Sequence, residues 1–416
     1  MAFFHVSGLG WRAVYLSDKH ILVALRAVVC TGFAAGLLLS WRLWTGAHSF
    51  PLVPLLPLPL PPVFQALLGG GLLLSLTALV FFPRRTWIAT AWAALLGLAL
   101  LDQMCWQPWA YQYALMLLPF FFFHREPGPA RLGTVLDVQR LIVAAVYFWS
   151  GVHKIGPGFT HLFDTYLASD LLGASAPALH PLILAGGRGI PWIEVGIGIG
   201  LLFRRTAPWA GGLALLTHLV ILLLIGPLGK AANSVVWPWN LAMMALVGLL
   251  FFPGRSIQWR NLGQAGFRYP TALIVLLVWI MPIGSFAKKW DRYLSFHLYS
   301  GQQQRVVVFF DAVAAAQVPG EILAWTKPSP LPGYRELNLS TWSMAEMNVP
   351  VVSEDRIILA LAKQLAALPI ESGEWYFHRD YPHLLASRGW AHYSPGEIRA
   401  LHRFPPLQLP ASLRKK

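Results

Sequence analysis

The sequence predicts an all-α polytopic membrane bundle of about nine transmembrane helices, followed by a small α+β C-terminal domain on the extracytoplasmic side. Of the 416 residues, 56% are hydrophobic and only 12% are charged, whereas soluble domains contain roughly 25% charged residues. Long apolar runs fill residues 20–287, but residues 288–416 have the composition of a globular domain. We therefore expect a transmembrane bundle over residues 1–288 and a soluble domain over residues 289–416.

The individual spans follow from the lengths of the apolar runs. A helix needs roughly 20 apolar residues to cross a bilayer, or fewer where it is packed inside protein. The runs that qualify are 20–41, 63–83, 86–103, 109–124, 137–154, 188–204, 207–226, 232–253 and 270–288, of which the fourth and sixth are the weakest. The fifth run contains Asp137, Arg140 and Lys154, so it is expected to lie inside the bundle rather than against lipid.

The charges at the span ends predict the orientation. Twelve Lys and Arg residues flank one set of links, and only Arg42, Lys154, Arg188 and Lys230 flank the other. Because cytoplasmic links carry the excess of Lys and Arg, the N-terminus is predicted to be cytoplasmic and the C-terminal domain periplasmic or otherwise extracytoplasmic, in the inner (plasma) membrane. This distribution also explains the net charge of +14 without a nucleic-acid partner.

Two outer links are unusual. The segment 51–62 is too rich in proline for helix or sheet and is expected to be an extended polyproline segment. The link 155–187 contains an amphipathic stretch, HLFDTYLASDLL, that is expected to lie in the membrane interface.

Polar side chains gather in the outer half of the predicted spans, as judged from a helical rise of about 1.5 Å per residue. They are Asp102, Gln107, Tyr111, Tyr113, His153, Lys154, Glu194, His218, Asn233, Trp237 and Asn240. Ionisable groups persist inside membranes where they pair or line a cavity. We therefore expect a polar pocket in the bundle that opens outward, beneath the C-terminal domain.

Four of these residues also have a structural interpretation. Lys154 could extend to the interface, and Glu194 could be the ion-pair partner of Arg188 or Lys154. His218 could be a hydrogen-bonded core histidine, and Asp102 could cap the fourth span.

Three segments carry a family resemblance. Residues 139–159, QRLIVAAVYFWSGVHKIGPGF, resemble a span of vitamin K-dependent gamma-glutamyl carboxylase and of related proteins with a horizontally transferred transmembrane (HTTM) domain. Residues 101–115 and 193–226 resemble two further segments of that family, in the same order. The resemblance covers most of residues 20–288 and places Lys154 on the lysine that serves as the family's base and His218 on a family histidine.

The resemblance implies a quinone or vitamin K hydroquinone as cofactor, with Lys154 taking a proton from it. The catalytic candidates are Lys154, His218 and Glu194. The candidates for cofactor contacts are the neighbouring polar and aromatic residues Tyr111, Tyr147, His153, Trp237 and Asn240. No metal is expected, because the histidines of the C-terminal domain lack a zinc spacing.

The alternative function is a non-catalytic membrane scaffold or accessory subunit that binds or matures a membrane or secreted partner protein. Trp109 stands where the family motif has a histidine, which removes a donor for a developing oxyanion. The outer domain is also small. A transporter is disfavoured, because the polar residues stay near one face of the membrane.

In the C-terminal domain, β-branched and aromatic content predicts strands at 305–310, 322–326 and within 373–383. A helix is expected over 354–367, starting after Ser353, and residues 394–397 have the pattern of a capping box. The segment 288–304 is expected to form an interfacial helix that docks the domain onto the bundle.

Overall fold

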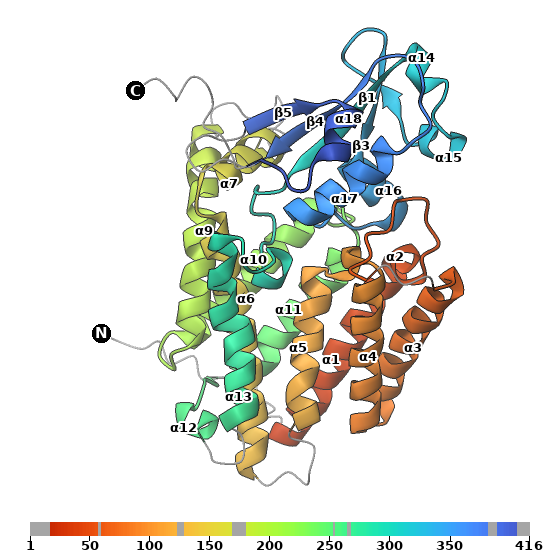
Figure 1. Ribbon diagram of the computed structural model, residues 1–416. Helices are drawn as coiled ribbons and strands as arrows, with labels where there is room; N and C mark the ends of the chain where they lie inside the picture. The colour runs from red at the N-terminus through yellow and green to blue at the C-terminus, as the bar shows by residue number, and fades with distance from the viewer. Residues whose placement is uncertain are drawn as a thin grey trace.

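The computed structural model describes residues 17–56, 60–122, 129–168, 180–252, 254–263, 268–381 and 389–405. A bundle of helices carries a small sheet domain at one end (Figure 1). Part of the proline-rich link, residues 57–59, and the end of the amphipathic stretch, residues 169–172, lie outside the described residues.

Each predicted span coincides with a helix. These helices are α1 (Asp18–Leu39), α3 (Pro62–Phe81), α4 (Arg85–Leu101), α5 (Pro108–Phe122), α6 (Pro129–Lys154), α9 (His180–Leu201), α10 (Ala207–Ile225), α11 (Val236–Phe251) and α13 (Arg268–Val275), which continues as π and 3-10 turns to Ala287. Within the described residues, five helical segments are long and apolar enough to cross a membrane: those of α1, α3, α6, α10 and Arg268–Ala287. The chain is therefore a multi-pass helical membrane protein.

The helices differ in how far they are covered by protein. Large apolar side chains such as Leu67, Phe81, Trp209 and Leu241 are 59–83% exposed, as expected for surfaces that face lipid. In contrast, 89% of the apolar window of α6 is buried, compared with 22% in α10. The prediction that the fifth span lies inside the bundle is therefore confirmed.

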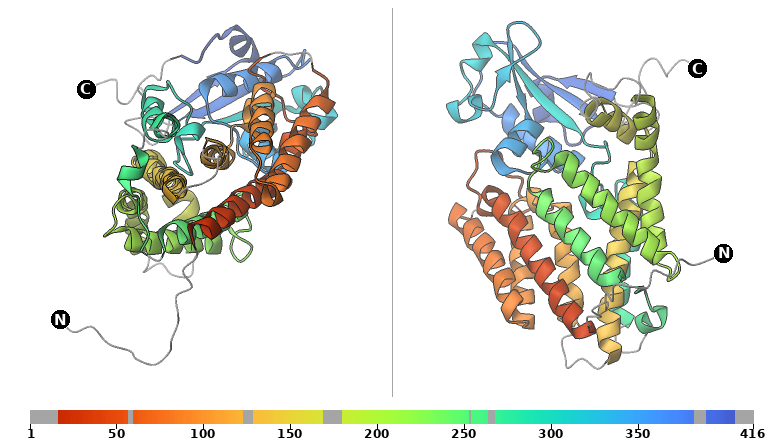
Figure 2. Two further views of the ribbon diagram at one scale, coloured as in Figure 1. Left: turned by 90° about the horizontal axis from the view of Figure 1, so that it is seen from below. Right: turned by 180° about the vertical axis from the view of Figure 1, so that it is seen from behind.

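Two glycines bring α9 against α6. A Cβ on Gly151 would lie 2.6 Å from the Pro191 carbonyl oxygen, and one on Gly198 would lie 2.5 Å from the Phe148 nitrogen. Larger residues at these positions would push the helices apart. On the back of the bundle, α11 packs between α1 and α10 (Figure 2).

The outer links are partly as predicted. The described parts of the proline-rich link, 51–56 and 60–61, contain neither helix nor strand, and Pro61 has the φ of −60° and ψ of 146° typical of polyproline II. The link after α6 forms α7 (Pro157–Leu162) and a π turn at 163–168. Phe159 of α7 and Phe163 of the π turn pack against residues of α9.

The C-terminal domain contains a five-stranded antiparallel sheet of order β2-β3-β1-β4-β5. The strands are β1 (Arg305–Asp311), β2 (Lys327–Pro328), β3 (Tyr334–Asn338), β4 (Trp375–Tyr381) and β5 (Gly389–Tyr393). Helices α16 (Leu339–Met347) and α17 (Asp355–Ala366) lie between the sheet and the bundle, and α14 (Ala312–Ala315), α15 (Gly320–Leu323) and α18 (Pro395–Ala400) complete the domain (Figure 1).

Several predictions for this domain are confirmed and others are wrong. The strands at 305–310 and within 373–383 are present, and Ser394 and Glu397 form the capping box. The strand predicted at 322–326 is wrong, because α15 occupies its first residues after Pro319. Helix α17 begins where predicted, but Ser353 does not cap it. Its hydroxyl instead accepts a hydrogen bond of 2.7 Å from the Gln304 main-chain nitrogen.

The interfacial helix predicted at 288–304 is also wrong. The helical structure of this segment is limited to one 3-10 turn, Tyr293–Ser295. Lys288 before the turn and Phe296 and Gly301 after it have positive φ angles of 54°, 59° and 68°. Left-handed residues interrupt a right-handed helix, so the segment folds as a series of turns. These turns nevertheless connect the domain to the bundle.

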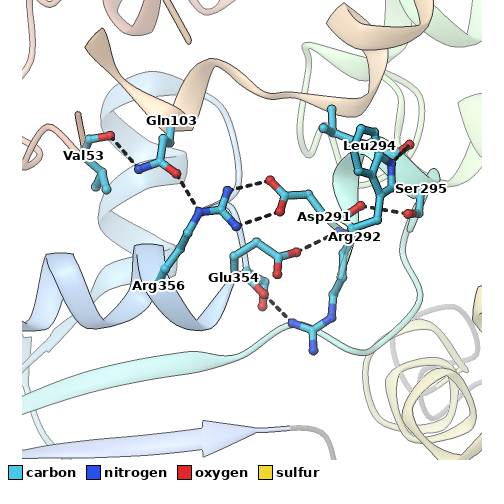
Figure 3. A network of polar contacts seen from close by, with 10 residues as sticks. Val53, Gln103, Asp291, Arg292, Leu294, Ser295, Glu354 and Arg356 are labelled. Atoms are coloured by element: carbon cyan, nitrogen blue, oxygen red, sulfur yellow. Dashed lines mark hydrogen bonds and ion pairs between the residues drawn. The ribbon is translucent and has the colours of Figure 1, made fainter. Parts of the chain in front are cut away.

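A network of charged side chains holds the turns against α17 (Figure 3). Arg356 donates to both carboxylate oxygens of Asp291, at 2.7 and 2.6 Å, and its Nε donates to Gln103 Oε1 at 2.8 Å. Arg292 donates through its main chain to Glu354 at 2.7 Å and through its guanidinium to the Ser353 carbonyl. Because Gln103 follows α4, the network joins bundle, link and domain.

Glu346 forms a second connection. Its carboxylate accepts hydrogen bonds from the main-chain nitrogens of Ser49 and Phe50, at 2.5 and 3.0 Å, and from Trp342 Nε1 at 2.8 Å. Charge-assisted hydrogen bonds of this kind are stronger than neutral ones. The loop after α2 (Trp41–Thr45) is thereby fixed beneath α16.

Candidate functional site

A cavity of about 440 Å³ lies between the bundle and the C-terminal domain. We call it the interdomain cavity. Its walls include Trp109 of α5, Trp239 of α11, Tyr293, His297 and Tyr299 of the turn segment, and Thr341 of α16. The volume falls in the range of about 300–1,000 Å³ that is usual for small-molecule sites. The walls combine aromatic and aliphatic side chains with hydroxyl and amide groups and the guanidinium of Arg305.

Lys154 forms an ion pair at the end of α6. Its ammonium donates to Ser150 Oγ, one turn earlier, and to Glu194 Oε2 of α9, both at 2.6 Å. The side chains of Lys154 and Glu194 are only 6% and 9% exposed. The interpretation that Lys154 extends to the interface is therefore wrong. Of the two partners considered for Glu194, the structure shows Lys154. The other, Arg188, has its guanidinium Nη2 3.8 Å from Asp164 Oδ2.

A second buried cluster joins three helices. Tyr147 of α6 lies 2.6 Å from His218 Nε2 of α10, and His218 Nδ1 lies 2.7 Å from Asn240 Oδ1 of α11. The Asn240 amide nitrogen donates to the Val236 carbonyl at 2.7 Å, so its oxygen faces the histidine. This network assigns the proton to His218 Nδ1 and makes Nε2 the acceptor for the Tyr147 hydroxyl.

His153 belongs to a third cluster, with a residue that the sequence did not indicate. Its ring stacks on that of His297, with centroids 3.6 Å apart and planes inclined by 21°. Burial, together with the neighbouring His153, Arg292 and Lys154, holds the pKa of His297 well below its usual value. His297 is therefore neutral at physiological pH, which allows the close stacking.

Two other sequence candidates, Tyr111 and Trp237, lie apart from these clusters. The Tyr111 hydroxyl is buried without a hydrogen-bond partner among the described residues, and its ring contacts Phe296. Trp237 Nε1 donates to the carbonyls of Ile225 and Ala232, so it fastens the link between α10 and α11.

Asp102 does not cap α5, contrary to one interpretation of the sequence. Its carboxylate accepts from the main-chain nitrogen of Met104 at 3.0 Å and of Val53 at 3.3 Å. It therefore caps a 3-10 turn, Gln103–Cys105, and holds the proline-rich link.

The polar clusters lie directly behind the cavity wall. Trp239 lines the cavity, and its ring meets His218 edge to face at 5.8 Å. His297 lines the cavity and stacks on His153, which precedes Lys154. Lys154, Glu194, Tyr147, His218 and Asn240 are not among the lining residues.

Sequence reasoning thus found the polar groups but missed most of the wall. Trp239, His297 and Tyr299 carried no motif. Their only signal was the abundance of aromatic residues near the predicted outer membrane boundary.

Within the described ranges, no three His, Cys, Asp or Glu side chains gather closely enough to hold a metal ion. No protein-family model, curated protein or solved structure matches this chain. The geometry of the cavity and the three clusters therefore provides the evidence for a function.

Proposed function

We propose that this membrane protein binds a quinone-type lipid in the interdomain cavity and exchanges protons with it through the buried groups behind the wall. The observation that carries the proposal is that two wall residues, Trp239 and His297, pack directly on the His218 and His153 clusters. The resemblance of residues 139–159 to the vitamin K-dependent carboxylase and HTTM proteins supports the same ligand class.

The cavity suits a flat, largely apolar ring with two oxygen atoms. Trp109, Trp239 and Tyr293 offer aromatic surface for the ring. Tyr299 and Thr341 offer hydroxyl groups for the oxygens. A hydroquinone would supply an ionisable hydroxyl group when bound.

In this proposal Lys154 is the base. The Lys154 ammonium passes a proton to the Glu194 carboxylate within the ion pair, and the resulting amine takes the hydroxyl proton. This leaves a hydroquinone anion, a lysine ammonium and a protonated Glu194. The Ser150 hydroxyl and Glu194 Oε2, both 2.6 Å from Nζ, keep the lysine in place during the transfer. Contact with Lys154 requires the wall side chain His297 or Trp239 to move, and the Tyr147–His218–Asn240 chain provides a second acceptor behind Trp239.

We further propose that about nine helices cross the membrane, with the N-terminus cytoplasmic and the C-terminal domain extracytoplasmic, in the inner (plasma) membrane. The arginines of the α9–α10 link and of the link between α11 and α12 (Trp259–Leu262) support this orientation, because they lie at the end opposite the sheet domain. A reporter enzyme that is active only outside the cytoplasm should be active when it is fused after Lys416. If instead a reporter that works only in the cytoplasm is active at this position, the proposed orientation is wrong.

The functional test uses purified protein in mild detergent. We expect an extractable quinone. The hydroquinone anion gives two electrons to dissolved O2, which yields quinone and peroxide, so hydroquinone-dependent oxygen consumption should fall at least about 100-fold in Lys154→Arg. Arginine preserves the counter-charge for Glu194 but is a poor base. The control Lys230→Arg, in the exposed link after α10, should keep full activity. Wild-type protein with neither quinone nor oxygen consumption would contradict the proposal.

The scaffold function is favoured by a different observation. Lys154, Glu194, His218 and Asn240 already satisfy one another, as in a purely structural core. If this is their role, Lys154→Arg changes stability but no reaction rate, and added quinone leaves the melting temperature unchanged.

A further inference from the structure

A second pocket lies at the opposite end of the bundle from the C-terminal domain. It has a volume of about 810 Å³ and is formed where α1 and α6 begin and where α9 and α11 end. This end also contains α12 (Trp259–Leu262) (Figure 1). We call it the basic pocket.

The charges of the basic pocket are strongly unequal. Its charged lining residues are Arg140, Arg204, Arg255, Arg260, Asp18 and Asp137. The four arginines come from three separate segments, so the fold and not the local sequence brings them together.

One carboxylate is already committed to one arginine. Asp137 Oδ1 accepts from Arg140 at 2.6 Å, and Oδ2 accepts from the Asn261 amide at 2.8 Å. Arg140 also donates to the Leu250 carbonyl at 2.8 Å. This pair supports the pocket floor without offering charge to a ligand. Arg204 and Arg260, which are exposed, line the same pocket, and the only other carboxylate among its described lining residues is Asp18.

The excess of guanidinium groups selects the ligand class. Arginine binds phosphate in two-point contacts that lysine cannot form. The pocket lies where apolar spans end, which is the depth of lipid headgroups. Basic pockets between transmembrane helices are suited to anionic lipid headgroups.

We propose that the basic pocket binds the phosphate headgroup of an anionic phospholipid. This site is separate from the interdomain cavity and does not depend on its ligand. Phosphate could also be supplied by a soluble molecule. The depth of the pocket at the span ends favours the lipid, and the experiment separates the two sources.

The test is native mass spectrometry of the purified full-length protein, titrated with phosphatidylglycerol, phosphatidylcholine or soluble glycerol 3-phosphate. Each arginine that contacts the bound headgroup contributes about fivefold to anionic lipid binding, so Arg204→Gln/Arg260→Gln should weaken phosphatidylglycerol binding by about 25-fold. The matched control is Arg205→Gln, an exposed neighbour outside the pocket, which should change affinity less than about twofold.

A variant with the opposite effect guards against misfolding. Asp18→Asn removes a negative charge from the pocket and should strengthen phosphatidylglycerol binding by several-fold. Unchanged phosphatidylglycerol binding in Arg204→Gln/Arg260→Gln would overturn the proposal. So would equal affinity for phosphatidylcholine, or soluble glycerol 3-phosphate binding as tightly as the lipid.

Discussion

Helix α6 carries two buried ion pairs whose surroundings differ. Asp137–Arg140, near its beginning, joins two residues of the same helix and borders the open basic pocket. Lys154–Glu194, at its end, joins α6 to α9 and lies behind the wall of the interdomain cavity. The first pair has extra partners in Leu250 and Asn261, whereas the one further partner of Lys154 within the described part of the chain is Ser150. A charge next to a hydrated pocket tolerates the loss of its partner better than one enclosed in protein.

Removing Glu194 should have the largest effect. Glu194→Leu leaves the Lys154 ammonium buried without a counter-charge, which costs about 3–5 kcal/mol. The double variant Lys154→Met/Glu194→Leu should recover most of that loss, because no charge remains. Denaturant titration in mixed micelles measures both. A double variant as unstable as Glu194→Leu would show that the pair matters for packing rather than charge.

Removing the charge of Asp137 should have a smaller effect. In Asp137→Asn, Arg140 keeps its bond to Leu250 and gains access to water in the basic pocket, so the cost is about 2–3 kcal/mol. The same titration compares the two variants directly. A loss as large as that of Glu194→Leu would remove the distinction between the two ends of α6.

The Tyr147 hydroxyl should contribute less again. Tyr147→Phe leaves His218 Nε2 as an unpaired buried acceptor, at a cost of about 1–2 kcal/mol. If His218 is part of a proton relay, this variant also changes the pH profile of hydroquinone-dependent oxygen consumption. An unchanged profile would assign His218 to the structural core alone.

The smallest expected effect is a pH dependence from His297. The folded protein keeps this histidine neutral, because burial and its positive neighbours lower its pKa. The unfolded chain protonates it near pH 6.5 and so binds more protons below that pH, which makes stability fall on acidification. Between pH 6.5 and 5.5 the loss is about 1 kcal/mol, and His297→Phe should abolish it. If the free energies of unfolding of the wild type and of His297→Phe change in parallel between pH 6.5 and 5.5, His297 is not the source of the pH dependence.

The bundle was predictable because apolar run length reports directly on a span, and the interior position of α6 followed from its polar residues. The pairing of Lys154 with Glu194, 40 positions away, left a choice of partners that only packing resolves. The turn segment failed as a predicted helix because its left-handed residues, Lys288 and Phe296, have no sequence signature. His297 reaches the site only through those turns, so sequence periodicity could not place it.

We propose that a quinone-type ligand occupies the interdomain cavity, and protection of a thiol in the cavity wall is the sharpest test of this. The native cysteines, Cys30 and Cys105, are both buried, so Thr341→Cys adds one exposed thiol in the cavity wall. Thr206→Cys, exposed in the α9–α10 link, is the matched control. The probe is decyl-ubiquinone, whose ring has no free position for a thiol to attack. We expect it to slow maleimide labelling of Thr341→Cys at least about tenfold, as for a site occupied at ten times its Kd, and to leave Thr206→Cys unchanged. Equal labelling of Thr341→Cys with and without the quinone would contradict the claim.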